Sequence, residues 1–577
     1  MNPANSGPRT AEIPEAVKKS YVSEALVDQA VERLFAARIR LGMFDPPADV
    51  PFSSIPYSED HSPAHKALAL KAAQESIVLL KNDGILPLGR NFHNIAVVGP
   101  TATALIDLEG NYNGTPVGAV LPLDGIEQTF GAGRVTYAQG TPFTAEVSVM
   151  VPRTAFPGGL AEAFYSNANF AGAPVATGHV KDIDVNWAAI DPAPGVDPNT
   201  FSVRWSGQIA APAAGDYEFE LQTRRRCDVG SGTESYTIHI AGSPDQHVEM
   251  RCNKRDQTFE PMRVHFADTA PRAFSIDFSH QSSRASDITF AWKPPLEALR
   301  EQAVDIARKA DVVVAFVGLS AWLEGEEMPL QVPGFAGGDR TSINLPAAQL
   351  QLLEALEATG KPVVIVLQSG SAIALGDTNA KARAVLEAWY PGEQGGQAIA
   401  DVLSGKVSPS GRLPVTFYAS TDQLPPFTDY SMRRRTYRYF SGQPEYPFGY
   451  GLSYTHFSYS GLKVSGAGQS RTISVRVSNS GEREGDEVAE LYLTPPAGEG
   501  LPVKSLKGFE RLHLPPGRSQ TVTFALTPRE LAFADTKGKM RTRKGQYQVW
   551  VGGGQRGTGA PGAASAFNLA SSTALPD

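Results

Sequence analysis

Short continuous apolar runs recur along the chain, separated by stretches with helical periodicity. Runs of this kind lie at 94–100, 312–317 and 361–370, and each reaches a glycine at or next to its end. They are typical of strands buried on both faces of a parallel sheet. Ala, Leu and Ile recur at helical spacing over 64–81, which predicts a helix there. Alternating strands and helices predict a parallel α/β layer.

This pattern changes twice. From about 144 to 295, many short segments alternate polar and apolar residues between Gly, Pro, Asn and Asp, which predicts an all-β sandwich. Because the α/β pattern resumes at 296, we expect the sandwich to be an insertion whose two ends lie close together. From 455 onward, short strands spaced by turns predict a second sandwich of the immunoglobulin-like or fibronectin-like type.

Length and charge narrow the functional classes. The 577 residues are enough for several domains of ~100–200 residues each. The formal net charge of −8 argues against a nucleic-acid partner, because such proteins normally present a basic face. No apolar run reaches ~18 residues, so no membrane span is expected. Residues 1–20 lack an apolar core, so no signal peptide is predicted.

The sequence gives no sign of a metal or a cofactor. Only two cysteines occur, Cys227 and Cys252, which excludes a disulfide-dense scaffold and a zinc site. They lie in neighbouring strand-like segments, so the sequence is compatible either with one disulfide bond between them or with two free thiols. The ten histidines form no recognisable ligand cluster. Gly395 and Gly396 precede a helix, but they match no dinucleotide or phosphate-loop spacing.

The loop after the apolar run 312–317 carries the most concentrated chemistry. Three carboxylates occur there, Glu324, Glu326 and Glu327. Ligands of open α/β sheets bind outside the carboxyl ends of the strands, so this loop is a candidate site. Acidic loops are also common as solvated surface, and spacing alone leaves both interpretations open.

Five motifs follow one another along the chain: AAQESIVLLKNDGILPL, IAVVGP, ADVVVAFVGLS with LEGEEM and GGDRTSINLP, AWYPGEQGGQAIADVLSGKVSPSGRLPVTF, and YRYFSGQPEYPFGYGLSYTHF. In this order they resemble glycoside hydrolase family 3, and the β-xylosidase and β-glucosidase branch is the most similar. The segment 144–295 is similar to the protective-antigen-type β-sandwich found inserted in some members, and the carboxyl-terminal segment resembles their fibronectin type III-like module.

The resemblance implies hydrolysis of a β-glycosidic bond with retention of configuration. Members usually begin with a (β/α)8 barrel that carries a nucleophilic aspartate. A six-stranded α/β sandwich follows, and one of its loops lends the general acid/base. Retention needs two carboxyl groups ~5–5.5 Å apart. One attacks the anomeric carbon, while the other protonates the leaving oxygen and then activates water.

Two residues compete for the acid/base role that the resemblance implies. Counting from Gly318 and Leu319 assigns it to Glu326, whereas counting from the Glu-Gly dipeptide assigns it to Glu324. We prefer Glu326, because neighbouring carboxylates favour the protonated form of an acid by like-charge repulsion. Glu327 is then a solvated or ion-paired neighbour.

Other residues of the loop receive supporting roles. Trp322 and Met328 are candidates for an apolar wall against a sugar ring, with packing of the loop itself as the alternative. Asp339 and Arg340 are expected to support the loop at the start of the following helix rather than to touch the sugar.

Aromatic residues elsewhere are interpreted mainly as packing groups. Trp389 and Tyr390 follow a buried strand, where core or interface packing is usual. Trp187, Trp205 and Trp292 occupy strand positions of the inserted segment, so they are expected in its core. The functional alternative for these three is carbohydrate binding.

The predicted fold class is multidomain α/β plus all-β: an α/β sandwich domain interrupted by a β-sandwich insertion and followed by a fibronectin type III-like sandwich. The start departs from the family pattern, since it resembles only the last barrel helix and its linker. The expected segments are 1–60 (barrel remnant and linker), 61–143 (α/β domain, first part), 144–295 (insertion), 296–454 (α/β domain, second part) and 455–577 (fibronectin type III-like domain and tail).

The resulting hypothesis is the carboxyl-terminal part of a retaining, exo-acting β-xylosidase or β-glucosidase that lacks its nucleophile domain and is incomplete alone. The alternative is an inactive remnant that at most binds a glycan or a partner. Expected partners are a β-linked oligosaccharide or aryl glycoside and a separate barrel chain or a homodimer partner. We expect an exposed apolar patch that includes part of 24–44. A periplasmic or secreted location is expected if an upstream part exists.

Overall fold

The computed structural model describes residues 12–89, 91–187, 190–223, 232–251, 259–282, 287–328, 330–498, 500–535 and 538–576. The chain divides into two compact units, Met1–Ala67 and Leu68–Asp577. Cys227 and Cys252 lie outside the described residues, and so do the two alternatives predicted for them, a disulfide bond or two free thiols.

The first unit consists of short helices. It contains α1 (Ile13–Lys18) and α2 (Glu24–Arg40), followed by 3₁₀ turns at 47–49, 51–54 and 57–59. The side chain of Ser23 caps the first turn of α2 by accepting a hydrogen bond from the Leu26 amide. No residue of α2 is buried, and its exposed apolar side chains are Leu26, Val31, Leu34, Phe35 and Ile39.

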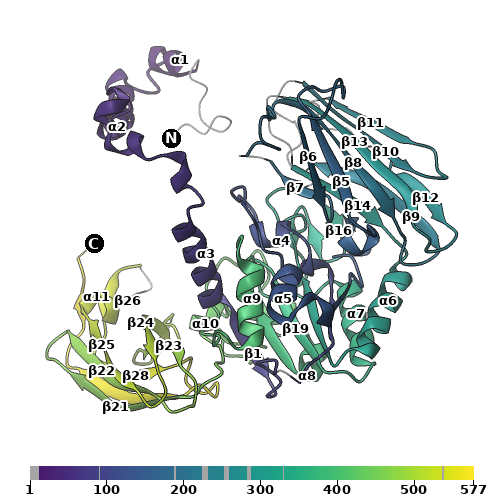
Figure 1. The fold of residues 1–577 in the computed structure, drawn as a ribbon. Coiled ribbons are helices and arrows are strands. Elements are labelled where there is room, and N and C mark those ends of the chain that lie inside the picture. The colour runs from purple at the N-terminus through teal and green to yellow at the C-terminus, as the bar shows by residue number, and fades with distance from the viewer. Residues whose placement is uncertain are drawn as a thin grey trace. The chain divides into compact units, whose positions relative to one another are not determined.

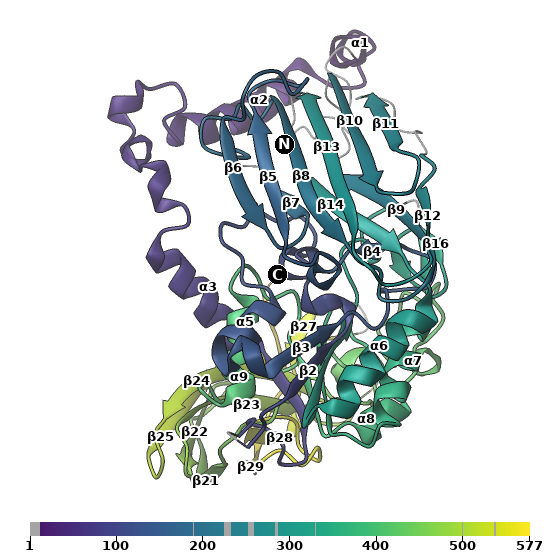
Figure 2. The ribbon, with the colours of Figure 1, turned by 45° about the vertical axis from the view of Figure 1, so that its right-hand side comes forward.

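The second unit is built around a six-stranded sheet (Figures 1 and 2). Five neighbouring strands are parallel, and β1 pairs with β20 in the antiparallel direction at one edge. The three predicted apolar runs form β2, β15 and β19, and every residue of these strands is buried. In sheet order the strands are β1 (Val78–Asn82), β20 (Ala384–Glu387), β19 (Val363–Gln368), β15 (Val312–Gly318), β2 (Ile95–Val98) and β3 (Val135–Ala138).

The predicted helix over 64–81 is wrong only at its end, over 77–81. Helix α3 covers Pro63–Ser76, and the chain then enters β1. The side chains of β1 are buried on both faces of the sheet, as Val78, Leu79 and Leu80 show. Pairing with β20 favours a strand here, although the apolar residues recur at helical spacing. A short apolar run fits a buried strand and a buried helical turn equally well, so periodicity alone could not separate them.

Helices cover both faces of this sheet. Helices α5 (Pro122–Phe130) and α9 (Gly395–Ser404) pack on the face that holds Val314 and Val366, whereas α6 (Leu296–Lys309) and α7 (Ala347–Glu357) pack on the other. Figure 2 shows α5 and α9 on one side and α6 and α7 on the other. The short helices α4 (Ile106–Glu109), α8 (Asp377–Lys381) and α10 (Thr436–Tyr439) lie in the connections.

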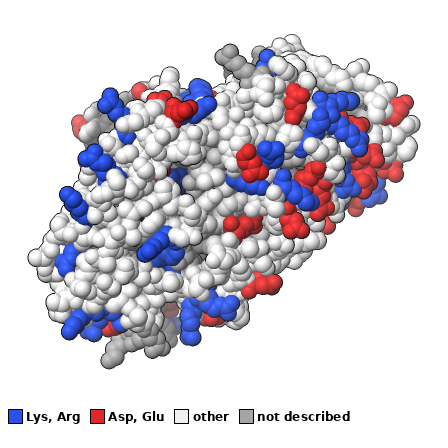
Figure 3. Space-filling model, turned by 90° about the horizontal axis from the view of Figure 1, so that it is seen from below, with Lys and Arg blue, Asp and Glu red and all other residues white. Residues whose placement is uncertain are grey.

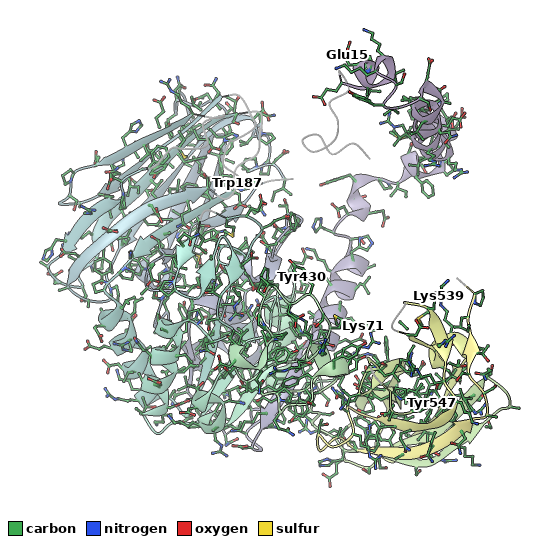
Figure 4. The ribbon with its side chains drawn as sticks, turned by 180° about the vertical axis from the view of Figure 1, so that it is seen from behind. Glu15, Lys71, Trp187, Tyr430, Lys539 and Tyr547 are labelled. Carbon is green, nitrogen blue, oxygen red and sulfur yellow. The ribbon has the colours of Figure 1, made fainter. Side chains whose placement is uncertain are left out.

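Two antiparallel sheets form the inserted sandwich. Its ends meet, because Met150 in β4 pairs with Ala291 in β14. The core contains Trp187, Trp205 and Trp292, all buried, which confirms their predicted packing role (Trp187 is marked in Figure 4). One sheet has the order β11 (Gln246–Arg251), β10 (Gly232–Ile240), β13 (Arg272–Ser282), β8 (Thr200–Ile209), β5 (Leu160–Tyr165) and β6 (Ala176–Val180). The other has the order β12 (Met262–Phe266), β9 (Gly215–Thr223), β14 (Asp287–Lys293) and β4 (Val149–Met150), with β7 (Asp184–Asn186) also paired to β14.

The carboxyl-terminal segment forms the second sandwich. Its core includes Tyr547, which is fully buried (Figure 4). One sheet consists of β21 (Phe457–Ser465), β22 (Arg471–Asn479) and β25 (Ser519–Leu526). The facing sheet consists of β24 (Ser505–Leu514), β23 (Gly485–Thr494), β28 (Gly545–Gly552) and β29 (Gly562–Leu569). Helix α11 (Pro528–Leu531) and the small sheet of β26 (Phe533–Ala534), β27 (Met540–Thr542) and β30 (Thr573–Ala574) complete it.

The surface carries charges of both signs. On the face seen in Figure 3, acidic and basic side chains are intermixed in the right-hand part of the view, whereas mainly basic ones lie in the left-hand part. Among the helices of the described residues, none is both long enough and apolar enough to cross a membrane.

Candidate active site

The predicted carboxylate loop leaves the carboxyl end of β15 in the middle of the parallel sheet. The loop contains a small antiparallel sheet of β16 (Gln331–Val332), β17 (Phe335–Ala336) and β18 (Asp339–Arg340). This sheet lies against the carboxylate-bearing segment, because the Met328 amide donates to the Gly337 carbonyl at 2.9 Å. Gly338 has φ +89°, and a Cβ there would lie 1.8 Å from the Gly325 carbonyl oxygen, so only glycine permits this close approach.

Glu324 is fixed by donors from the ends of two neighbouring strands. Its Oε1 accepts from the Gly370 amide at 2.8 Å and from the Tyr390 hydroxyl at 2.7 Å. Its Oε2 accepts from the Ser371 hydroxyl at 2.7 Å. Gly370 and Ser371 follow β19, and Tyr390 follows β20. The half-buried Glu324 carboxylate therefore ties the loop to the carboxyl edge of the sheet.

The half-buried Tyr390 and the buried Glu387, next to Glu324, have shifted pKa values. Burial, reinforced by the charge of Glu324, raises the pKa of Tyr390 far above its usual value, so the phenol remains a donor. Burial likewise raises the pKa of Glu387 well above its usual range, again helped by the charge of Glu324. The Trp389 amide donates to Glu387 Oε1 at 2.9 Å. Burial thus favours the protonated form of Glu387 next to the hydrogen-bonded Glu324.

Arg340 holds the end of the loop. Its guanidinium donates to the carbonyls of Ser342, Asn344 and Ala372, each at 3.0 Å, and to the Ser371 hydroxyl at 3.1 Å. Burial lowers the pKa of Arg340, and the charge of Glu324 opposes this effect. Asp339, its predicted companion, is exposed. Arg340 and Glu324 therefore share Ser371 as a common partner.

Glu326 and Glu327 are both exposed, unlike Glu324. Glu326 Oε2 accepts a hydrogen bond from the Tyr112 hydroxyl. Glu327 has φ +47°, the left-handed region that non-glycine residues seldom adopt. The loop thus presents one fixed carboxylate, Glu324, and one solvent-facing carboxylate held by a tyrosine, Glu326.

The tyrosine belongs to a second loop that sequence reasoning missed. Residues 110–114 read Gly-Asn-Tyr-Asn-Gly and follow α4. The Asn111 side chain donates to the Glu324 carbonyl at 2.6 Å, next to the contact between Tyr112 and Glu326. A signal was available, because this loop also follows a parallel strand, β2, whose carboxyl end lies at the same edge as that of β15.

The two residues proposed for an apolar wall, Trp322 and Met328, pack partly against the protein itself. Trp322 is half-buried and packs partly against the core. The Met328 sulfur folds back over Gly325 of its own loop. Tyr390 was interpreted only as a packing residue, whereas its hydroxyl reaches Glu324. Within the described ranges, no group of three or more His, Cys, Asp or Glu side chains is arranged to hold a metal ion.

Comparisons with known proteins agree with this architecture. Residues 77–454 match the glycosyl hydrolase family 3 C-terminal domain, and residues 487–555 match the fibronectin type III-like domain. The chain is 36% identical over 554 residues to a xylan 1,4-β-xylosidase of Xylanibacter ruminicola, covering 94% of this chain and 62% of that protein. It is 30% identical over 569 residues to a β-glucosidase of Rhizobium radiobacter, covering 93% and 66%.

A solved structure shows the same arrangement of elements. The β-glucosidase of Kluyveromyces marxianus in complex with glucose superimposes with a TM-score of 0.64 at 27% identity, covering 89% of this chain and 63% of that one. The chain therefore spans slightly less than two thirds of the length of these relatives. With the family domain matched over 77–454, the chain belongs to glycoside hydrolase family 3.

Proposed function

We propose that this chain is the carboxyl-terminal part of a retaining, exo-acting β-xylosidase or β-glucosidase and contributes the acid/base loop. The observation that carries the proposal is the pair Glu324 and Glu326 on the loop after β15, at the sheet edge where ligands of such folds bind. The named relatives, a β-xylosidase and β-glucosidases, support the substrate class of β-linked xylosides or glucosides.

We assign the acid/base role to Glu326 and an anchoring role to Glu324. A group that gives and then takes a proton must reach the glycosidic oxygen, and the exposed Glu326 carboxylate is accessible for this. Glu324 has both oxygens engaged by the three donors described above, so it is better suited to hold the loop. Glu324 remains the alternative acid/base.

The nucleophile is proposed to come from outside these 577 residues. A retaining reaction needs a second carboxyl group ~5–5.5 Å from the acid/base, on the opposite side of the sugar. A (β/α)8 barrel in a longer form of the protein, in a separate chain or in a homodimer partner would supply it. The exposed apolar side chains of α2 support a missing partner of this kind.

Hydrolysis of chromogenic aryl β-xylosides and β-glucosides tests the proposal. The chain is assayed alone and with a family 3 barrel, beside its Glu326→Ala and Glu324→Ala variants. We expect no turnover by the chain alone and turnover with the barrel. Glu326→Ala should abolish hydrolysis of poor leaving groups but retain reaction of activated ones, with azide replacing the lost base.

Three other outcomes would overturn parts of the proposal. Turnover by the chain alone, lost in one variant, would place the nucleophile within these residues. Azide rescue of Glu324→Ala but not of Glu326→Ala would exchange the two assignments. No turnover in any combination, together with glycan binding by the chain alone, would favour a non-catalytic binding module.

A further inference from the structure

We propose that Tyr112 is a positioning residue for Glu326, holding one carboxylate oxygen so that the other faces the scissile bond. The inference rests on the proposed acid/base role of Glu326. Tyr112 donates to Glu326 Oε2, although the two residues lie 214 positions apart in the chain. Among the described residues, no hydrogen bond engages Oε1. One oxygen is thus held, and the other is available for proton transfer.

The loop that carries Tyr112 is anchored independently of it. The Asn111 side chain donates to the Glu324 carbonyl at 2.6 Å. Gly110 lies against the Tyr390 ring, since a Cβ on Gly110 would meet the ring at 3.0 Å. The Gly392 amide donates to the Leu108 carbonyl at 2.9 Å. These contacts fix the loop at residues that flank Tyr112, so its phenol is presented by a supported backbone.

Tyr112 has no packing role that would explain its place. Its side chain is 85% exposed, which separates it from the tyrosines of the core. Its backbone has φ +54°, a conformation that is strained for a bulky residue and persists only where the surroundings impose it. An exposed aromatic residue in a strained conformation, with its hydroxyl on a candidate acid/base, is typical of a functional contact.

The charge at this contact keeps the phenol a donor. The hydrogen bond to Glu326, and then the negative charge of that carboxylate, raise the pKa of Tyr112 above its usual value. The phenol therefore stays protonated through the pH range in which glycosidases operate. Among the described residues, neither Glu324 nor Glu327 accepts a hydrogen bond from this hydroxyl, and Glu324 is engaged by its own three donors.

The first test needs no turnover. The full chain is labelled with ¹³C at tyrosine Cζ, and the Tyr112 resonance is assigned by its loss in Tyr112→Phe. We expect Glu326→Gln to lower the pKa of Tyr112 toward the ordinary value of about 10. Glu327→Gln is the matched control, because it removes a neighbouring exposed carboxylate, and it should change the titration much less. An unchanged titration in Glu326→Gln would overturn the proposal.

The second test separates positioning from simple contact. In the active assembly, kcat/KM is measured for aryl glycosides over a range of leaving-group basicity. Tyr112→Phe keeps the ring and removes the donor, and we expect about a tenfold loss for poor leaving groups, little loss for activated ones and an unchanged KM. Tyr112→Leu should match Tyr112→Phe, because the hydroxyl rather than the ring is responsible.

The two proposals fail in different ways. If Tyr112→Phe has the leaving-group dependence of the unmodified protein, Tyr112 does not position the acid, whatever its titration shows. If Tyr112 titrates as expected but Glu326→Gln still hydrolyses poor leaving groups at the full rate, the contact stands and the acid/base assignment fails. If neither the titration nor the kinetics responds, the inference from Tyr112 is wrong.

Discussion

Glu324 and Glu487 both accept hydrogen bonds from tyrosine hydroxyls and lie near an arginine, but they occupy different surroundings. Glu487 on β23 accepts from Tyr459 at 2.6 Å and from Arg412 at 2.7 Å, and its side chain is 2% exposed. Glu324 accepts from Tyr390 and from donors after β19, and it is half-buried beside the exposed Glu326.

The difference teaches how to separate a structural carboxylate from a candidate site. Arg412 precedes the carboxyl-terminal sandwich and Glu487 belongs to it, so their ion pair joins that sandwich to the rest of the unit. This ion pair stabilises the fold because each buried charge compensates the other. Glu324 lies at the carboxyl edge of a parallel sheet, where a ligand can approach its loop. Location and exposure, rather than the hydrogen-bond pattern, distinguish the two.

The largest expected effect comes from breaking the buried pair. Arg412→Met removes the cation and leaves Glu487 buried without its charge partner. Burial already raises the pKa of Glu487, and the charge of Arg412 opposes that effect. Removal of one partner of a buried pair typically costs about 3–5 kcal/mol. Urea unfolding, followed through the transition of the carboxyl-terminal sandwich, measures the loss.

Arg308→Met is the control for this change. Arg308 forms an exposed pair with Asp305 within α6, with side chains that are 65% exposed. Such pairs contribute about 0–1 kcal/mol. An equal loss in the two variants would contradict the distinction between buried and exposed pairs.

The next effect is a dependence of stability on pH at the same junction. Burial raises the pKa of Glu490 to about 7, and Tyr492 donates to it at 2.7 Å. The carboxyl group of Glu490 therefore keeps its proton to a higher pH in the folded state than in the unfolded state. Its protonation contributes to the free energy of unfolding at low pH, and this contribution is lost as the pH rises. Between about pH 5.5 and 8 the loss should be about 2 kcal/mol.

Glu490→Gln tests this pH dependence, because an amide cannot titrate. Its unfolding free energy should fall less steeply with pH than that of the unmodified chain. Some decline should remain, since burial also raises the pKa of Glu445 to about 7. Parallel pH profiles for the two proteins would show that Glu490 titrates normally.

The sequence predicted the local parts of both regions better than their long-range contacts. Strands buried on both faces were recognisable from their apolar runs, as was the carboxylate loop after β15. The contacts of Tyr112 and Tyr390 were not predicted, because the order of strands in the sheet brings together residues that are far apart in the chain. Tyr112 lies 214 positions from Glu326, and Tyr390 lies 66 positions from Glu324. The error at 64–81 arose in the same way, since β1 is defined by its pairing with β20.

Loss of the Glu324 anchor should have a smaller effect on stability. Glu324→Ala leaves the Gly370 amide and the hydroxyls of Ser371 and Tyr390 without their acceptor, although solvent can reach part of this region. We expect a cost of about 1–2 kcal/mol and faster hydrogen exchange of the Gly370 amide. Glu324→Gln is the control, because an amide oxygen can still accept from Gly370. Exchange that is slow in both variants would contradict the anchoring role.

The smallest effect should come from removing one donor from Glu324. Tyr390→Phe keeps the half-buried ring and leaves Gly370 and Ser371 in place, so we expect a loss of about 1 kcal/mol. Tyr430, which is 88% exposed, offers the matched Tyr→Phe control and should show no change (Figure 4). Thermal unfolding and Gly370 exchange measure both. A loss in Tyr390→Phe as large as that in Arg412→Met would mean that Glu324 is as strongly structural as Glu487, and the comparison would fail.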